Sequence, residues 1–266
     1  MQRNFYKAHP WHGIQIGKDM PKVVNSFIEI VPTDTVKYEI DKETGYLKID
    51  RPQKFSNIVP ALYGFVPQTY CGELTADLAR NASGKEIEKG DGDPLDILVL
   101  SERAITHGDI ICEAIPIGGI RMIDKGEADD KIIAVLKDDS MYGKWKDIKD
   151  CPKSIIDRLV HYFLTYKNIP GEEKVAVDID DVYGSEVAHQ VILKSREDYR
   201  NMFGWSLELV TIAEFETLGS AEDIQSRLSL AGIKAEVSKD AQFELQVLEK
   251  DVNSASKLIE YFMSQN

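Results

Sequence analysis

Three aspartates stand within six residues in the stretch "GDGDPLDILVL", which ends in an apolar run. Carboxylates this close repel one another unless a positive group lies between them. Asp91, Asp93 and Asp96 offer only oxygen ligands, which suit hard cations such as Mg²⁺ or Mn²⁺. An EF-hand loop is excluded, because Leu95 and Asp96 occupy the positions where it needs an oxygen ligand and a glycine. The spacing favours a divalent-cation site, and a solvated acidic turn is the alternative.

Two further groups of charged residues are weaker signals when each is taken alone. In "MIDKGEADDKIIAV", Asp124, Asp129 and Lys131 precede a strand, much as the first three aspartates do. In "VKYEID", Lys37 and Glu39 share one face of an expected strand, because side chains alternate along a strand. Such residues are usually a charged turn or a solvated strand face, so only their combination points to a site.

The elements that carry these residues are expected to be short strands from residue 23 to about residue 136. The expected strands are "FIEIV", "VKYEID", "YLKID", "DILVL", "ICEAIPIGG" and "KIIAVL", and Lys42 to Gly45 is read as a hairpin turn. Strands at this spacing with no helical period between them favour an antiparallel barrel or sandwich. Residues 72–90 are polar and turn-rich, and we predict a long loop there that leads into the aspartates.

Helical periodicity appears in "CPKSIIDRLVHYFLTYKN", where Ile155, Leu159, Phe163 and Tyr166 recur at helical spacing. The predicted helix packs across the barrel and carries Tyr166 and Lys167 at its end. Residues 206–266 read as a β-α-β-β-α module, with Ser220 as a helix cap and Val252, Ala255, Ile259 and Phe262 on one face of the last helix. This pattern is similar to small ferredoxin-like modules, and either a signalling role or subunit packing would suit it.

Composition narrows the class of protein. A net charge of −13 argues against nucleic-acid binding, which needs a basic face. The longest apolar run is "IIAVL", far shorter than the roughly 20 residues of a membrane helix, so no membrane association is expected. The N-terminus has no apolar signal region, and the three cysteines form no metal-binding pattern. We therefore expect a cytoplasmic protein.

The order of these motifs along the chain is more informative than any one of them. "IEI", "KYEIDKETG", "DRPQ", "LYGF", "DGDPLD", "DKGEADDK" and "HYFLTYK" together resemble the soluble family I inorganic pyrophosphatases, over residues 10–168. "DGDPLD" matches the family signature D-x-D-P-x-D at each defined position. The stretch "HPWHG" and the insertion before Asp91 are similar to the animal-like branch of this family.

The resemblance implies an α+β fold: a five-stranded antiparallel OB-like β-barrel with flanking helices in a catalytic domain, residues 1–205. A small ferredoxin-like accessory domain follows at residues 206–266. The implied activity is Mg²⁺-dependent hydrolysis of pyrophosphate to two phosphates by a metal-activated water, with Mn²⁺ as a possible substitute. A homo-oligomer, dimer or hexamer, is also implied.

The resemblance also assigns roles to thirteen residues. Asp93 is the expected base. The expected metal ligands are Asp91, Asp96, Asp124, Asp129, Glu39 and Glu29, with Asp96 shared between two metals. The expected phosphate-binding residues are Lys37, Arg51, Tyr63, Lys131, Tyr166 and Lys167. These roles agree with the charge of the substrate: cations neutralise phosphoryl oxygens and lower the pKa of a bound water from about 15.7 toward 7, and lysines and arginines stabilise the leaving phosphate.

Two departures from the family pattern affect the expected site. Val59 stands before Pro60 where many bacterial members have tyrosine, so a phosphate contact from that ring is missing. Lys125 follows Asp124 where members often have another acid, which would alter the affinity of the outer metal.

Other functions remain open from the sequence alone. One is a Mg²⁺-dependent hydrolase of nucleoside or longer polyphosphates, although no Walker A motif and no Nudix-like glutamate run is present. Another is a barrel-type binding protein that holds structural Ca²⁺, which would leave Lys37, Arg51, Lys131 and Lys167 without a purpose. The third is an inactive relative of the family with a regulatory tail.

Overall fold

The computed structural model describes residues 7–54, 56–168, 177–204, 209–239, 242–248 and 252–264. The chain divides into two compact units, Met1–Tyr199 and Arg200–Asn266. The predicted limit between two domains, after residue 205, falls outside the described residues. No helix in the described ranges is long and apolar enough to cross a membrane.

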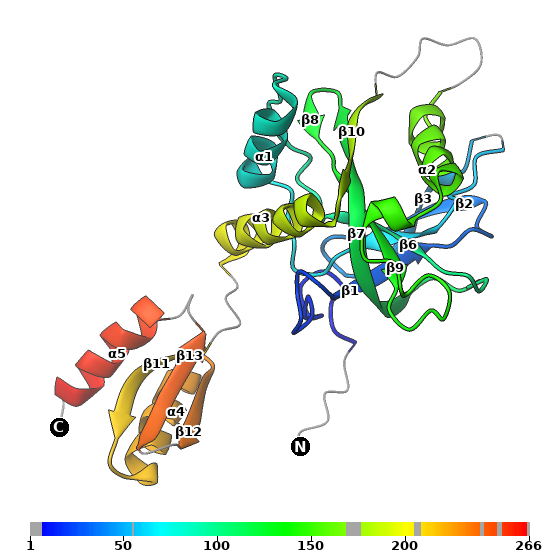
Figure 1. Ribbon diagram of the computed structural model, residues 1–266. Helices are drawn as coiled ribbons and strands as arrows, with labels where there is room; N and C mark the ends of the chain where they lie inside the picture. Colours follow the sequence, from blue (N-terminus) through cyan, green and yellow to red (C-terminus); the bar gives the residue numbers. More distant parts are fainter. Residues whose placement is uncertain are drawn as a thin grey trace. The chain divides into compact units, whose positions relative to one another are not determined.

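The first unit is an α+β structure built around a strand-rich sheet (Figure 1). Its strands are β1 (Val24–Ile30), β2 (Val36–Ile40), β3 (Leu47–Pro52), β4 (Leu62–Phe65), β5 (Lys89–Gly90), β6 (Asp96–Leu100), β7 (Ile110–Asp124), β8 (Glu127–Ala128), β9 (Lys131–Leu136) and β10 (Val177–Gly184). Its helices are α1 (Glu73–Ser83), the short 3₁₀ helix η1 (Ile148–Asp150), α2 (Lys153–Thr165) and α3 (Ser185–Phe203). Strands β2 and β3 form a separate two-stranded hairpin.

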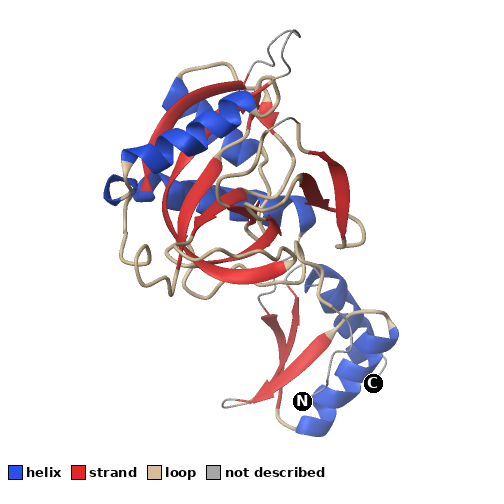
Figure 2. Ribbon diagram, turned by 90° about the vertical axis from the view of Figure 1, so that its right-hand side faces the viewer, coloured by secondary structure: helices blue, strands red, loops and turns tan. Residues whose placement is uncertain are grey.

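Five strands close into a ring in the order β1-β4-β6-β9-β7, because β7 also pairs with β1 (Figure 2). Four of the five pairings are antiparallel, but β6 and β9 run in parallel, with Asp96 opposite Lys131. The prediction of a wholly antiparallel barrel is therefore wrong at this pair. The long strand β7 follows β6 in the chain and runs antiparallel to β9. Two reversals of chain direction therefore separate β6 from β9, so the two strands run the same way. This pairing places the first residues of β6 and β9 at the same end of the ring.

Two apolar clusters pack the ring against helices, one against α2 and the other against α3. Strands β6 and β9 are apolar runs with buried residues on both faces, as expected for strands covered on both sides. On one face, residues such as Leu98 and Ile133 pack with Leu159 and Phe163 of α2. On the other face, residues such as Ile97 pack with Ala188, Val191 and Ile192 of α3. The helical face predicted for residues 151–168 is thereby confirmed, since Ile155 and Tyr166 also belong to the α2 cluster.

Residues 72–90 are not the long loop that we predicted, because helix α1 occupies Glu73–Ser83. The buried residues of this helix are small, namely Thr75, Ala76 and Ala79, so the segment has little apolar signal. The two alanines pack against Ile87, Ile123 and Ala128. Gly84 ends the helix in the left-handed conformation, at φ +67°, which glycine adopts without strain.

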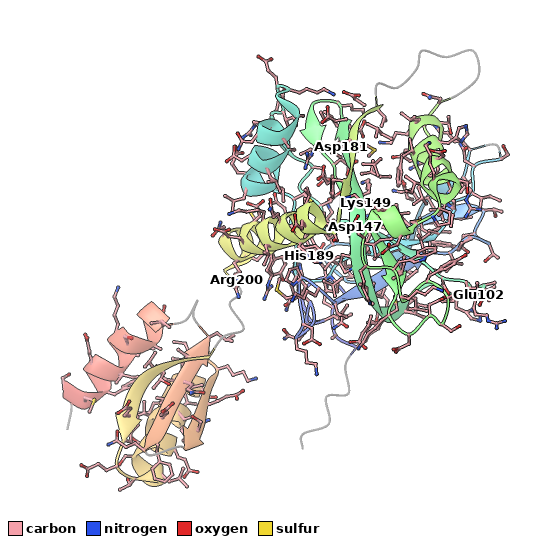
Figure 3. All side chains as sticks on the ribbon, viewed as in Figure 1. Glu102, Asp147, Lys149, Asp181, His189 and Arg200 are labelled. Carbon is pink, nitrogen blue, oxygen red and sulfur yellow. The ribbon has the colours of Figure 1, made fainter. Side chains whose placement is uncertain are left out.

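Strand β10 and helix α3 had no counterpart among the predicted elements. The signal for α3 was present, since its buried Ala188, Val191, Ile192, Ser195 and Tyr199 recur at helical spacing. The start of α3 is fixed from outside the helix: the Asp147 carboxylate accepts hydrogen bonds from the Ser185 N–H at 2.9 Å and the Ser185 hydroxyl at 3.0 Å. Figure 3 labels Asp147 near the start of α3 and Arg200 near its end.

The second unit consists of β11 (Leu209–Phe215), α4 (Leu218–Leu230), β12 (Ala235–Lys239), β13 (Phe243–Leu248) and α5 (Val252–Ser264). Its strands form an antiparallel sheet in the order β11-β13-β12. The predicted cap Ser220 is wrong: Thr217 caps α4, and its hydroxyl accepts from the Ser220 N–H. The predicted face of the last helix is confirmed, because its four residues join the apolar cluster of this unit.

Candidate active site

An acidic cavity of about 300 Å³ lies where three neighbouring strands of the ring present the same end. Asp96 begins β6, Lys131 begins β9 and Asp124 ends β7. Eleven of the thirteen predicted site residues line this cavity: Lys37, Arg51, Tyr63, Asp91, Asp93, Asp96, Asp124, Asp129, Lys131, Tyr166 and Lys167. Residues far apart in the sequence thus meet at one place, as the motif order implied.

The other two predicted residues, Glu29 and Glu39, line a second cavity of about 520 Å³ beside the hairpin. The two cavities share Lys37, Tyr63, Asp93 and Asp96, so all thirteen residues belong to one continuous region. Tyr162, which also lines the acidic cavity, was missed by the sequence reasoning. Its ring stacks on that of Tyr166, and burial raises the pKa of Tyr162 to about 12.

Lys131 is the positive group that lies among the aspartates. Its side chain is buried, and its ammonium forms ion pairs with Asp96 and Asp129. Burial alone would lower the pKa of Lys131, but the charges of Asp129 and Asp96 raise it well above its usual value. The Tyr63 hydroxyl donates a further hydrogen bond to Asp96. A buried cation therefore offsets part of the repulsion among these carboxylates.

The carboxyl groups of Asp91 and Asp129 form a hydrogen-bonded pair. Burial and the neighbouring Asp129 charge raise the pKa of Asp91 well above its usual value. The pKa of Asp129 is instead lowered, because Lys131 and the hydrogen bond from Asp91 outweigh the effect of burial. A cation bound between the two carboxyls would relieve the repulsion that raises the pKa of Asp91.

Glu29 connects the ring to the β2–β3 hairpin. Its buried carboxyl on β1 accepts a hydrogen bond from the Ile40 N–H of β2, at 2.6 Å. Burial, and then the nearby charge of Asp96, raise the pKa of Glu29 to about 8. The group therefore holds its proton near neutral pH in the absence of a metal.

Glu29→Gln is expected to stabilise the metal-free protein at pH 8 and to have little effect at pH 5. The folded-state pKa of about 8 is above the unfolded value of 4.5, so the folded state of the wild type loses stability as pH rises between these values. The neutral amide removes this loss, which amounts to about 2–4 kcal/mol. Urea unfolding in EDTA at both pH values measures it, and an equal effect at pH 5 and pH 8 would contradict it.

The basic residues of the cavity come mostly from the hairpin and from the end of α2. The Lys37 ammonium lies 2.9 Å from Asp50 Oδ2 and 3.2 Å from Glu39 Oε2, which confirms that Lys37 and Glu39 share a face. Arg51 also pairs with Asp50. At the end of α2 the Lys167 ammonium pairs with Asp124 at 2.5 Å.

Asp93 lies at the mouth of both cavities, where its side chain is about half exposed. Its carboxylate forms an ion pair with Lys42 of the hairpin turn. Lys42 was missed by the sequence reasoning, which treated it only as a turn residue. No local pattern could have found it, because the pair joins segments 51 residues apart.

The cavity suits divalent cations by the chemistry of its donors. Among the residues that the structure describes, no three acidic, histidine or cysteine side chains are already arranged as a metal cage; lysines hold the carboxylates instead. Oxygen-only ligands are nevertheless those that Mg²⁺ prefers. One oxygen of Asp124, Oδ1, is buried without a hydrogen-bond partner among the described residues, and burial together with the charge of Asp129 disfavours the charged form of Asp91 unless a cation is near. These residues therefore fit metal ions.

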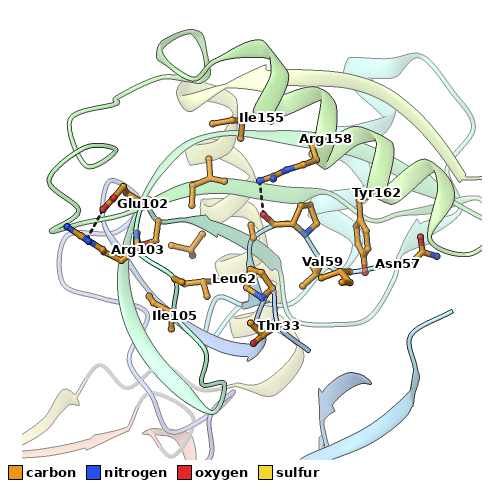
Figure 4. Close-up of a pocket in the computed structure, with 18 of the residues that line it drawn as sticks. Thr33, Asn57, Val59, Leu62, Glu102, Arg103, Ile105, Ile155, Arg158 and Tyr162 are labelled. Carbon is orange, nitrogen blue, oxygen red and sulfur yellow. Dashed lines mark hydrogen bonds and ion pairs between the residues drawn. The ribbon is translucent and has the colours of Figure 1, made fainter. Parts of the chain in front are cut away.

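A third cavity, of about 600 Å³, lies beside α2, and none of the thirteen residues lines it (Figure 4). Its lining includes Val59, Leu62, Ile105 and Ile155, and Arg158 donates to the Pro60 carbonyl oxygen at 3.2 Å. Val59, which replaces the family tyrosine, is thus placed here and not in the acidic cavity. The second departure, Lys125, forms the β7–β8 turn at φ +54° and does not line the acidic cavity.

The fold and the site define a class of protein: an acidic cavity that also presents four cations is what a metal-dependent hydrolase of phosphate anhydrides needs. The family model described as inorganic pyrophosphatase matches residues 26–200. The chain belongs to the inorganic pyrophosphatase family, as predicted from its motifs. Enzymes of this family depend on divalent metal ions. The match ends at residue 200, where the second unit begins.

Relatives support the same assignment. An inorganic pyrophosphatase of Chlamydia muridarum is 53% identical over 200 residues, which are 74% of this chain and 96% of that protein. The soluble inorganic pyrophosphatase 3 of Arabidopsis thaliana is 38% identical over 199 residues, covering 75% and 82%. Among solved structures, the Thermus thermophilus inorganic pyrophosphatase has a TM-score of 0.60 at 27% identity, covering 73% of this chain and 99% of that one.

Proposed function

We propose that this chain hydrolyses inorganic pyrophosphate to two phosphates, with several Mg²⁺ ions bound in the acidic cavity. The observation that carries the proposal is the pairing of two sets of side chains in one cavity. Four aspartates, Asp91, Asp96, Asp124 and Asp129, offer metal ligands, and four cations face them, Lys37, Arg51, Lys131 and Lys167. A ligand that satisfies both sets must be anionic and must arrive with metal ions, as magnesium pyrophosphate does.

The metal ions, when bound, would neutralise phosphoryl oxygens and make water easier to deprotonate. Asp91, Asp96 and Asp129 would hold the activating ions, and Asp96 would be a ligand shared by two of them. Asp124 and Asp129 would together bind a further ion, since the buried Oδ1 of Asp124 is unpartnered within the described part of the chain. Glu39 and Glu29 line the adjoining cavity and would support the substrate side of the metal cluster.

Asp93 is the proposed base that orients and deprotonates the attacking water. Its position at the junction of the two cavities, with a half-exposed carboxylate, gives it access both to solvent and to the substrate. The remaining six residues, Lys37, Arg51, Tyr63, Lys131, Tyr166 and Lys167, are proposed to bind the phosphates. Their charges stabilise the negative charge that gathers on the leaving phosphate.

The architecture and assembly are proposed in the same terms. The ring of five strands supports an OB-like barrel as the core of a catalytic domain at residues 1–205. The order β11-α4-β12-β13-α5 supports a ferredoxin-like accessory domain at residues 206–266. We propose a homo-oligomer, a dimer or a hexamer, that acts in the cytoplasm, where Mg²⁺ is the physiological metal and Mn²⁺ a substitute.

The purified chain is expected to release two phosphates per pyrophosphate in the presence of Mg²⁺, and chelation by EDTA is expected to abolish the release. Phosphate is measured colorimetrically, with ATP and tripolyphosphate as parallel substrates. Faster release from ATP than from pyrophosphate would assign the site to nucleoside polyphosphates. Metal binding by calorimetry without release of phosphate from any of the three would reject the enzyme proposal.

A further inference from the structure

A buried aspartate on α3 caps a helix that lies far from it in the sequence. Asp198 is only 5% exposed, and its carboxylate accepts hydrogen bonds from the N–H groups of Gly72, Leu74 and Thr75, each at 3.0 Å. The N-cap of α1 is Gly72, which has no side chain to satisfy these groups. The first N–H groups of a helix lack partners within the helix and favour a negative charge. Asp198 supplies both the acceptor and the charge.

The segment Tyr70–Gly72, which we call the linking segment, lies between α3 and the loop that carries Asp91 and Asp93. On the α3 side, the Tyr70 N–H donates to the Ser195 carbonyl oxygen at 2.9 Å, in addition to the bond from Gly72 to Asp198. On the other side, the Cys71 N–H donates to the Asp93 carbonyl oxygen at 2.8 Å. The loop returns a bond from Gly92 N–H to the Cys71 carbonyl oxygen at 3.0 Å.

The contact between the linking segment and the loop is close as well as hydrogen-bonded. A Cβ atom added to Gly90 would lie 2.2 Å from the Cys71 carbonyl oxygen, so only glycine fits there. The position of the loop backbone therefore depends on the linking segment, and the position of the linking segment depends on Asp198. Asp91 and Asp93 leave this same stretch of backbone toward the cavity.

We propose that Asp198 is a positioning residue for the hydrolysis of pyrophosphate, an inference that rests on the function proposed above. It does not line either of the cavities that hold the thirteen residues. It fixes the linking segment, and the linking segment fixes the backbone of Gly92 and Asp93. Its effect on the reaction is thus transmitted through two layers of backbone hydrogen bonds.

The test is Asp198→Asn in the full chain, followed by hydrogen exchange and steady-state kinetics. The amide nitrogen replaces an acceptor with a donor that faces N–H groups, at unchanged size. Exchange of the peptide spanning residues 88–98 is expected to rise by about tenfold. The kcat for pyrophosphate is expected to fall by about 10- to 100-fold, with KM within about threefold, because the phosphate-binding cations are unaffected.

Glu197→Gln is the matched control, since Glu197 is the neighbouring acid on α3 and pairs with Lys194 at the surface. It is expected to change neither exchange nor kcat. A second variant, Gly72→Ala, keeps the Asp198 carboxylate but crowds its contact with the linking segment, because the added Cβ would lie 3.0 Å from the Asp198 Cγ. It is expected to show the same faster exchange, and it serves if Asp198→Asn does not fold.

A lower melting temperature with unchanged exchange at residues 88–98 and unchanged kcat would overturn the proposal, since Asp198 would then only stabilise α1. If the wild type releases no phosphate from pyrophosphate, the proposed function fails separately. In that case faster exchange at residues 88–98 still supports the placement of the loop by Asp198, and unchanged exchange overturns it.

Discussion

Asp93→Asn is expected to lower kcat for pyrophosphate by about 10²- to 10⁴-fold, the usual contribution of a general base. Asparagine has the same size as aspartate but cannot accept the proton of the attacking water. The fold should not change, because the Asp93 side chain is about half exposed and an exposed ion pair contributes about 0–1 kcal/mol. Initial rates of phosphate release at saturating Mg²⁺ measure the effect.

Asp157→Asn provides the comparison for this substitution. Asp157 forms a surface ion pair with Lys153 on α2 and lines none of the three cavities described above. Its removal is expected to leave kcat within about twofold. If Asp93→Asn behaves like Asp157→Asn, the base is another residue, and the role proposed for Asp93 is wrong.

Lys131→Met is expected to destabilise the metal-free protein by about 3–5 kcal/mol, the usual cost of leaving buried charges without their partner. Lys131 is the buried cation that pairs with both Asp96 and Asp129. Mg²⁺ is expected to recover much of this loss, because bound cations replace the missing charge. Because Mg²⁺ also stabilises the wild type, the recovery measures how much more tightly the variant binds Mg²⁺, at about 1.4 kcal/mol for each tenfold difference in dissociation constant. Urea unfolding in EDTA and in excess Mg²⁺ measures both quantities.

The comparison for Lys131→Met is Lys137→Met, which removes a surface lysine paired with Glu113. That variant is expected to lose less than about 1 kcal/mol in either buffer. Equal destabilisation of Lys131→Met with and without Mg²⁺ would show that no metal replaces the lysine.

Much of the catalytic ring was predictable because its strands carry local signals. The buried runs around Ile97 and Ile132 are apolar on both faces, and the helix at Leu159 has a clear period. The candidate site residues were predicted from the order of their motifs, and the structure places all thirteen around the two adjoining cavities.

What the sequence did not reveal depends on contacts between distant segments. The parallel pairing of Asp96 with Lys131 depends on the order of the strands in the sheet, which the periodicity of a single segment does not indicate. Helix α1 has small buried residues, and its cap is supplied by Asp198, 126 residues after Gly72. The ion pair between Lys42 and Asp93 likewise joins two turns that no spacing rule connects. The parallel pairing, the cap of α1 and the Lys42–Asp93 ion pair share this cause.

Strands β2 and β3 form a sheet of their own, so the candidate site is built from two substructures, the five-stranded ring and the β2–β3 hairpin. Asp96, Asp124 and Glu29 lie on strands of the ring, and Asp91 and Asp129 lie just before ring strands, whereas Lys37, Glu39 and Arg51 stand on the hairpin. Glu29 contacts the hairpin by accepting a hydrogen bond from the Ile40 N–H. Substitution of Lys37 or Arg51 would therefore alter the fit of the anion while the four aspartates of the acidic cavity are unchanged. Natural variation at these two residues would in this way change which phosphate anhydrides fit, such as longer or bulkier ones, while the aspartates of the cavity stay the same.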